Sequence, residues 1–205
     1  MVADYISGLH CGRYCRYTYL ERDMRIFFAL ELDTKTRRAL RNLAYKAEEY
    51  GHGRWVREDN YHITLRFLGE QPLPLIRRIE GLPLAEGREA FLYRIGGIGR
   101  FPRNRGDILW AGVSAGEDRL AGLKQLLDEH LVAIGFPAED RSYHPHITLA
   151  RDVKWEQGGY ARLEELDISL PGTAGGITLM ESRSTAEGVR YIPLKRWALG
   201  NGTAD

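Results

Sequence analysis

The sequence predicts an α+β fold built from two copies of one structural unit. Among its 205 residues, the tetrapeptide His-Ile-Thr-Leu occurs at residues 62–65 and again at residues 146–149, an offset of 84 residues. A strand pattern and then a helix pattern precede each copy in the same order. Gly51 and Gly135 each stand 11 residues before the histidine of their copy, where a glycine can end the preceding helix. We therefore expect a bilobal, pseudo-twofold duplicated unit in which each copy forms one lobe.

The first copy starts with a mostly apolar segment at residues 26–32, which is typical of a buried strand. Asp33 follows it and can cap a helix. The apolar face of that helix has helical spacing: Leu40, Leu43, Ala44 and Ala47. After the motif, a Gly-Glu-Gln-Pro turn at 69–72 predicts a helix around 75–79 and then a strand near 91–98.

The second copy repeats this order with a strand at 108–113 and Ser114 as the expected helix cap. The apolar face of its helix comprises Leu120, Leu123, Leu127, Leu131 and Ile134. Alternation and turn residues predict strands at 176–181 and 191–199 and surface loops at 99–106, 152–159 and 171–176.

Charge and hydropathy restrict the class of protein. The chain has 29 Lys and Arg against 28 Asp and Glu, a net charge of +1, which excludes proteins that hold long nucleic acid by bulk attraction. The longest uninterrupted apolar run, at 26–30, is far shorter than a membrane span. No basic start followed by a long apolar stretch is present. We expect a cytoplasmic protein with no membrane association.

The boundaries of the expected domain follow from the strand at its start. Met24 leads directly into that strand, so residues 24–199 are expected to form one domain and residues 200–205 a tail. Residues 1–23 are expected to be an N-terminal extension or a misassigned start. Both cysteines, Cys11 and Cys15, lie in that segment and are expected to be reduced thiols rather than a disulfide or a zinc site.

The two motifs carry the residues suited to catalysis. Side chains alternate along a strand, so His62 and Thr64 point to one side while the isoleucine and leucine point into the core. The same holds for His146 and Thr148. Packing about a pseudo-twofold axis would bring both pairs together across a cleft. Because the ordinary pKa of histidine lies near neutrality, one imidazole can give a proton while the other takes one.

A metal site is not expected from the spacing of the histidines. His144 and His146 could share one face of a strand, yet no nearby Asp, Glu or Cys completes a first shell. His144 is expected at the rim of the site. His10, His52 and His130 have no partner in the repeat and are expected on the surface.

The residues quoted above resemble the two-histidine phosphoesterases, most closely the RNA 2′,3′-cyclic phosphodiesterases, historically called 2′-5′ RNA ligases. The resemblance rests on residues 60–69 and 144–151, on Arg25-Ile26-Phe27-Phe28-Ala29, Gly99-Arg100-Phe101-Pro102 and Leu109-Trp110, and on Leu179-Met180-Glu181-Ser182 with Tyr191 and Trp197. It covers about residues 24–199. It implies two antiparallel sheets flanking a central active-site cleft, with helices outside, and hydrolysis of RNA 2′,3′-cyclic phosphate ends to 2′-phosphates without metal or cofactor.

The resemblance also implies a role for each motif residue. His62 would be the general acid and His146 the general base, although the sequence alone is symmetric in this respect. Thr64, Thr148 and Arg151 would bind the phosphate. Arg66, Phe101, Arg103 and Tyr143 are candidate RNA contacts, with a solvated arginine and ordinary packing as the competing interpretations.

Three classes of function follow from these residues. The first is a monomeric cyclic phosphodiesterase that acts on RNA or an oligonucleotide with a terminal cyclic phosphate. The second is a related enzyme that forms 2′-5′ linkages or hydrolyses small cyclic nucleotides. The third is a noncatalytic RNA-end binding module in which the histidines only contact phosphate.

Overall fold

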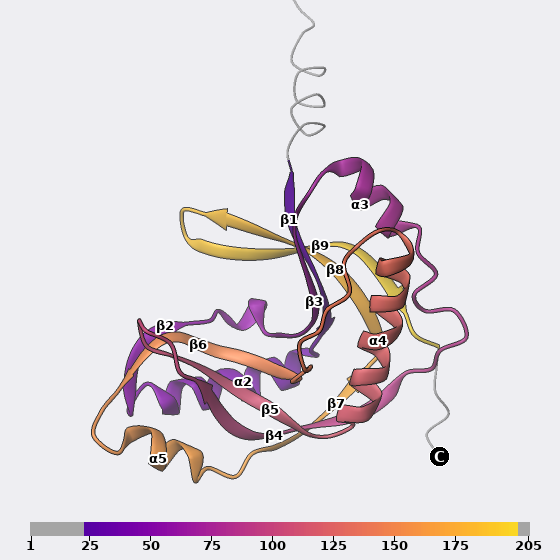
Figure 1. Cartoon of the computed structure of the whole chain (residues 1–205). Coiled ribbons are helices and arrows are strands. Elements are labelled where there is room, and N and C mark those ends of the chain that lie inside the picture. The colour runs from indigo at the N-terminus through magenta and orange to yellow at the C-terminus, as the bar shows by residue number, and fades with distance from the viewer. Residues whose placement is uncertain (1–22, 201–205) are drawn as a thin grey trace, which may run out of the picture.

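The computed structural model describes residues 23–200, which form two antiparallel β-sheets (Figure 1). The four-stranded sheet has the order β3-β1-β8-β9, and the five-stranded sheet the order β2-β6-β5-β4-β7. The strands are β1 (Met24–Glu31), β2 (Gly51–Trp55), β3 (His62–Gln71), β4 (Phe91–Phe101), β5 (Asp107–Ala115), β6 (His146–Trp155), β7 (Ser169–Ala174), β8 (Gly176–Thr185) and β9 (Gly188–Ala198). The expected α+β fold with two antiparallel sheets is confirmed. The expectations for Cys11, Cys15, His10 and the extension lie outside the described residues.

The helices are α2 (Thr34–Ala47), α3 (Leu73–Glu80), α4 (Glu117–Ala133) and α5 (Gly159–Glu164), with a 3-10 turn at Glu58–Asn60. α2 follows a strand of the four-stranded sheet but packs against β6 and β7 of the other sheet. α4 follows β5 of the five-stranded sheet and contacts β3. α2 and α4 thus each connect the two sheets. Within residues 23–200, no helix has both the length and the apolar character to cross a membrane.

The 84-residue repeat is visible in the elements but not in the lobes. β3 and β6 are both ten residues long and begin at the two motif histidines. β1 and α2 correspond to β5 and α4, and β4 corresponds to β8. β4, however, lies in the five-stranded sheet with the second copy, and β8 lies in the four-stranded sheet with the first. The prediction that each copy forms one lobe was therefore wrong, because the copies exchange these strands. The exchange fits one domain over residues 24–199.

Most predicted elements are present, and α2 and α4 each have one of their two predicted end residues. The Asp33 side chain accepts a hydrogen bond from the Thr36 backbone N–H at 2.8 Å, as an N-cap does. Ser114 was wrongly predicted as the second cap, because β5 runs on to Ala115 and Gly116 caps α4 with a φ of 82°. Gly135 follows α4 as predicted, with a φ of 100°. Gly51 does not end α2; it begins β2.

Three of the predicted loops are partly or wholly strand. β4 includes residues 99–101, and β6 runs through residues 152–155. The segment 171–176 was misassigned because it contains Pro171 and glycines, residues that are usual in turns. Pro171 is tolerated here because β7 is the edge strand of its sheet, where one side of the strand needs no N–H donor.

The core is formed by the apolar faces that the sequence predicted. Ile26, Phe28 and Leu30 are buried on one face of β1, together with Leu40 and Ala44 of α2. The leucines of α4 at 120, 123, 127 and 131 are also buried. A smaller apolar cluster of Phe27, Ala29 and Met180, with Tyr191 against it, lies on the opposite face of the four-stranded sheet. That second face carries the candidate site.

Candidate active site

The two motifs open two equivalent strands, and their side chains alternate as predicted. Ile63 and Ile147 are fully buried in the core, whereas both histidines and both threonines are half-buried on the other face. The ring of His62 lies 5.0 Å from that of Phe27, which belongs to the smaller cluster. The motif strands therefore present one His-Thr pair from each sheet.

Both motif strands contain a β-bulge at the motif leucine. On β1, Phe28 and Ala29 are consecutive, but their partners on β3 are Arg66 and Thr64, so Leu65 is the extra residue. On β5, Leu109 and Trp110 pair with Ala150 and Thr148, so Leu149 is extra in the same way. A bulge reverses the alternation that follows it. The residue five places after each histidine therefore turns to the same face as that histidine.

This bulge changes the expected position of two arginines. Arg151, five residues after His146, is exposed, and its charge lowers the pKa of both His62 and His146. Simple alternation would have placed it on the opposite face. Arg66 occupies the position equivalent to Ala150 and points away from the smaller cluster, with only 7% of its surface exposed. The interpretation of Arg66 as a solvated arginine at a strand end was wrong.

Each motif histidine is held by the carbonyl of the residue two places before it. His62 Nδ1 lies 2.7 Å from the Asn60 carbonyl, and His146 Nδ1 lies 2.7 Å from the His144 carbonyl. Because a carbonyl oxygen only accepts, both Nδ1 atoms carry hydrogen. In the neutral histidines this leaves Nε2 as the free base. Thr64 Oγ1 lies 2.9 Å from His62 Nε2 and donates to it.

Asn60 also fixes the first histidine from behind. Its side-chain Nδ2 donates to the Val189 carbonyl at 2.8 Å, and its Oδ1 accepts from the Tyr191 backbone N–H at 3.3 Å. These bonds hold the 3-10 turn against β9. The sequence pattern gives no sign of this role, because the partners of Asn60 lie about 130 residues away on β9.

Aromatic rings enclose each histidine. The rings of Phe27 and Tyr191 both lie 5.0 Å from the His62 ring. Phe101 lies 5.1 Å and Trp110 6.0 Å from the His146 ring. Trp110 lies flat over Gly99, where a Cβ would stand 2.1 Å from the indole ring. A side chain at position 99 would therefore displace the tryptophan that supports His146.

Burial lowers the pKa of both histidines. Burial is the largest cause in each case and is opposed by the hydrogen bond to the upstream carbonyl. The charges of His146 and Arg151 lower the pKa of His62 further, and its pKa falls to about 4. His144 and Arg151 act in the same direction on His146. Both imidazoles are therefore neutral at neutral pH in the free protein, and the two half-sites are close enough to interact electrostatically.

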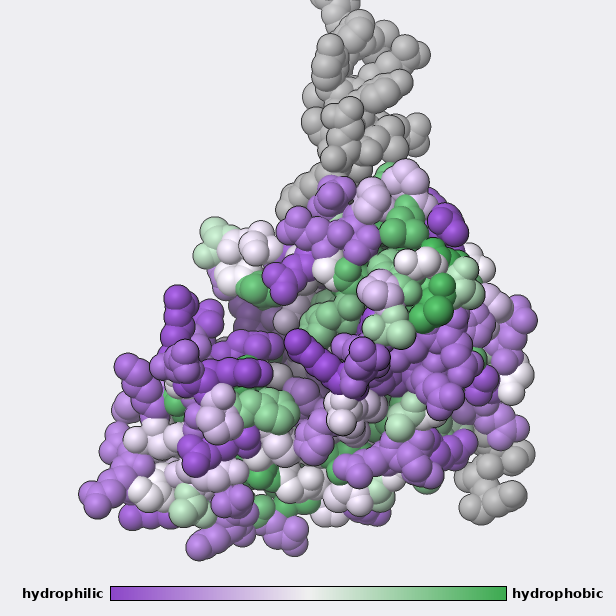
Figure 2. Space-filling view, viewed as in Figure 1, coloured by the Kyte–Doolittle hydropathy of each residue, from purple (hydrophilic) through white to green (hydrophobic). Residues whose placement is uncertain are grey.

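A pocket of about 370 Å³ extends from the site, which is large enough for a small ligand. It is lined by Thr64, Leu65, Arg66, Phe67, Phe101, Arg103, Lys124, Glu139, Arg141, Ser142, Tyr143, His144 and His146. Figure 2 shows the surface recessed near the middle of the view, with hydrophilic residues and some apolar ones at the edge of the recess. The predicted RNA contacts Arg66, Phe101, Arg103 and Tyr143 all line this pocket, as does His144, which was expected at the rim. Phe67 lines it too and was not predicted.

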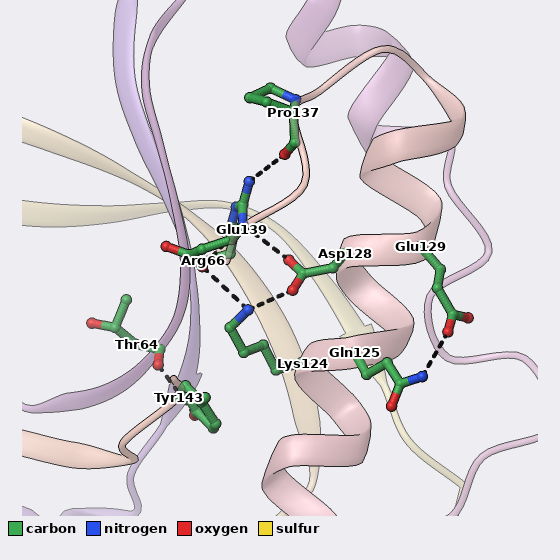
Figure 3. A network of polar contacts seen from close by, with 9 residues as sticks. All are labelled: Thr64, Arg66, Lys124, Gln125, Asp128, Glu129, Pro137, Glu139 and Tyr143. Carbon is green, nitrogen blue, oxygen red and sulfur yellow. Dashed lines mark hydrogen bonds and ion pairs between the residues drawn. The ribbon is translucent and has the colours of Figure 1, made fainter. Parts of the chain in front are cut away.

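A network of charges around the buried Arg66 and Lys124 forms one wall of the pocket (Figure 3). Arg66 Nη1 lies 2.9 Å from Glu139 and 3.4 Å from Asp128, and its Nη2 donates to the Pro137 carbonyl at 2.7 Å. Lys124 of α4 contacts both carboxylates. Burial would raise the pKa of Glu139, but Lys124 and Arg66 hold it below its usual value.

The network fixes the segment that leads into β6. Tyr143, near the end of that segment, donates from its hydroxyl to the Thr64 carbonyl at 3.2 Å (Figure 3). Arg66 and Tyr143 therefore both link β3 to the chain immediately before His146. These contacts connect the strand that begins at His62 to the segment that ends at His146.

The histidines outside the motifs have separate surroundings. His52 is exposed on β2, 3.3 Å from Glu156, as expected of a surface residue. His130 bonds to the Leu126 carbonyl at 2.9 Å within α4. Among residues 23–200, no group of three or more His, Cys, Asp or Glu side chains is placed to hold a metal ion.

The sequence is similar to a family model and to named phosphodiesterases. The model described as the 2′-5′ RNA ligase superfamily matches residues 33–186. The RNA 2′,3′-cyclic phosphodiesterase of Escherichia coli is 31% identical over 190 residues, which cover 88% of this chain and 99% of that protein. The protein of the same name from Aeropyrum pernix is 41% identical over 98 residues, or 47% of this chain and 55% of that one.

The fold is also similar to a solved structure. The crystal structure of E. coli LigT in its apo form superposes with a TM-score of 0.73 at 28% identity, and the match covers 88% of this chain and 99% of that chain. The two-sheet architecture therefore has a known structural relative.

Proposed function

This chain belongs to the 2′-5′ RNA ligase superfamily, and on that basis we propose that it is a hydrolase of 2′,3′-cyclic phosphates at RNA ends. Relatives that align over most of its length are named RNA 2′,3′-cyclic phosphodiesterases. The observation that carries the proposal is the pair of His-Thr motifs on equivalent strands, each with a histidine whose Nδ1 is fixed by a carbonyl and whose Nε2 remains a base.

The proposed reaction uses the two histidines in opposite directions. Nε2 of His146 takes a proton from water as the water oxygen attacks phosphorus. The bond between phosphorus and O3′ breaks, and protonated His62 gives its proton to that oxygen. The product is a 2′-phosphate with a free 3′-hydroxyl. Ligation to a 2′-5′ linkage needs only a different nucleophile: a 5′-hydroxyl takes the place of water, His146 takes its proton as its oxygen attacks phosphorus, and the bond to O3′ breaks with a proton from His62.

The remaining residues stabilise the phosphate. The hydroxyls of Thr64 and Thr148 donate to its nonbridging oxygens, and Arg151 balances the charge that develops on them. Because His62 is buried and neutral in the free protein, the anionic substrate supplies the negative charge that raises its pKa and permits protonation. Acid, base and charge stabilisation all come from side chains, so the proposed mechanism requires no metal.

The test is hydrolysis of an oligonucleotide that ends in a 2′,3′-cyclic phosphate, performed in EDTA, with the position of the product phosphate determined. The proposal predicts a 2′-phosphate. A 3′-phosphate would contradict the assigned bond cleavage, and complete loss of activity in EDTA would contradict the metal-independent mechanism.

Two further functions are separated by the same assay. Adding a 5′-hydroxyl oligonucleotide detects 2′-5′ joining, and cyclic mononucleotides detect a small-molecule phosphodiesterase. A noncatalytic RNA-end binding module would bind the oligonucleotide without turnover, and His146→Ala would then change nothing in the assay. We also propose a monomer that acts in the cytoplasm, which sedimentation and cell fractionation would check.

A further inference from the structure

The repeat assigns a counterpart to the phosphate-binding arginine. Residue 67 is related to residue 151 by the 84-residue offset, and both follow the bulge at the motif leucine. Arg151 therefore has Phe67 as its equivalent on β3. Phe67 pairs with Phe27, and their rings lie 5.8 Å apart, so Phe67 stands on the face that carries His62.

Phe67 is too exposed to serve the core. It is 62% exposed, although it sits in a strand whose apolar neighbours Ile63 and Leu65 are buried. Its ring lines the same pocket as Thr64 and His146. An exposed phenyl ring at the mouth of a nucleic-acid site is a surface on which a base can stack, and such stacking accepts any base.

Two arginines of the pocket are free to bind a second phosphate. Arg66 and Lys124 are neutralised by Asp128 and Glu139. Arg103 and Arg141, by contrast, are exposed and form no ion pair with any residue of the described chain. The terminal phosphate is already provided for by the threonines and Arg151. A cyclic mononucleotide has no other phosphate, whereas an RNA end has the phosphodiester on the 5′ side of its last nucleotide.

We propose that Phe67, Arg103 and Arg141 form a subsite for the nucleotide that precedes the cyclic-phosphate end. Phe67 stacks on the base of that nucleotide, and the two arginines bind the phosphodiester that joins it to the last one. The inference rests on the proposed function and adds to it that the substrate is an RNA end of at least two nucleotides. Phe101, whose ring lies against His146, remains available for the terminal base.

The test compares two substrates, adenosine 2′,3′-cyclic phosphate and the dinucleotide ApA with a 2′,3′-cyclic phosphate end. The wild-type protein is expected to have a higher kcat/KM for the dinucleotide. Phe67→Ala is expected to lower the ratio of the two kcat/KM values by about tenfold, which is the scale of losing one stacked base. Arg141→Gln is expected to lower the same ratio by a smaller factor and to weaken its dependence on salt.

Matched controls lie on the exposed surface of α2. Tyr45 is an aromatic residue that is 53% exposed, and Arg38 is an exposed arginine. Tyr45→Ala and Arg38→Gln should leave the ratio unchanged. The melting temperature of each variant would establish that it is folded.

The outcomes separate this inference from the proposed function. If the wild-type protein hydrolyses neither substrate, the proposed function fails. If it hydrolyses both and Phe67→Ala leaves the ratio of the two kcat/KM values unchanged, the function stands and the subsite is overturned, whether the two values stay the same or fall equally. Equal lowering would assign Phe67 to the terminal base instead.

Discussion

The two half-sites share a backbone and differ in chemistry. Both strands start at a histidine, contain a bulge at the motif leucine and turn the sixth residue of the strand outward. In the β6 half that residue is Arg151, and in the β3 half it is Phe67. His62 is the more deeply buried histidine and bonds to Thr64, whereas His146 adjoins His144 and the open pocket. The two halves of the repeat thus have equivalent strands, and they differ in that one carries an arginine, the proposed phosphate contact, where the other carries an exposed aromatic ring.

The largest expected effect is the loss of either histidine. His62→Ala and His146→Ala should each lower kcat on a cyclic-phosphate end by about a thousandfold, because general acid and base catalysis each contribute on that scale. Binding of an oligonucleotide with a 2′-phosphate end should stay within a few fold in both variants. His52→Ala, in an exposed histidine outside the site, is the control. Unchanged turnover in either motif variant would show that the two histidines do not act as a pair.

The second prediction concerns the position directly after the bulge, which holds Arg66 on β3 and Ala150 on β6. Arg66→Met should lower the free energy of unfolding by about 2 kcal/mol, because it removes one of the two buried cations that pair with Asp128 and Glu139 and leaves only Lys124. Arg103→Met, in an exposed arginine of the same pocket, should change it by less than about 0.5 kcal/mol. Urea denaturation measures both. Equal effects would mean that the network does not stabilise the wall of the pocket.

The third prediction separates Arg151 from Phe67. Arg151→Gln should lower kcat/KM by about a hundredfold, as expected when a donor to the developing phosphate charge is removed. The loss should be equal for the mononucleotide and the dinucleotide, because both have the terminal phosphate. A loss confined to the dinucleotide would place Arg151 on the preceding nucleotide and contradict its assigned role.

The fourth prediction is the pH dependence of kcat/KM, which reports the free protein. Catalysis needs one histidine protonated and the other neutral, so the rate peaks between their two pKa values. Burial lowers both below 6.5, that of His62 to about 4, so the maximum should lie below pH 6.5. The maximum of kcat should lie at higher pH, because the bound phosphate anion favours the imidazolium. A kcat/KM maximum above pH 7 would contradict the burial of the site.

The sequence predicted what depends on local pattern. The repeated tetrapeptide, its alternation and the leucines of α4 were sufficient to place both His-Thr pairs on strands and to identify the core. They could not reveal the bulge, because an extra residue is defined only by the pairing with β1 or β5. For that reason the burial of Arg66 in an ion-pair network was not foreseen and Phe67 was overlooked.

Other parts of the molecule depend on contacts between distant segments. The exchange of β4 and β8 depends on which strands each of them pairs with. A strand in either sheet would have the same alternation of apolar and polar residues, so the sequence pattern could not distinguish the two arrangements. The role of Asn60 depends on β9, and that of Arg66 on carboxylates more than 60 residues away. Ser114 is a common helix cap, but here the strand continues past it and the left-handed Gly116 serves instead.

The measurement that tests the paired half-sites most directly is a double-mutant cycle on hydrolysis of the cyclic-phosphate dinucleotide. Residues that act in one transition state are strongly non-additive. We expect the double variant, with both His62→Ala and His146→Ala, to be about as slow as either single variant. If the two losses multiply instead, each histidine acts independently, and the two do not form one acid-base pair.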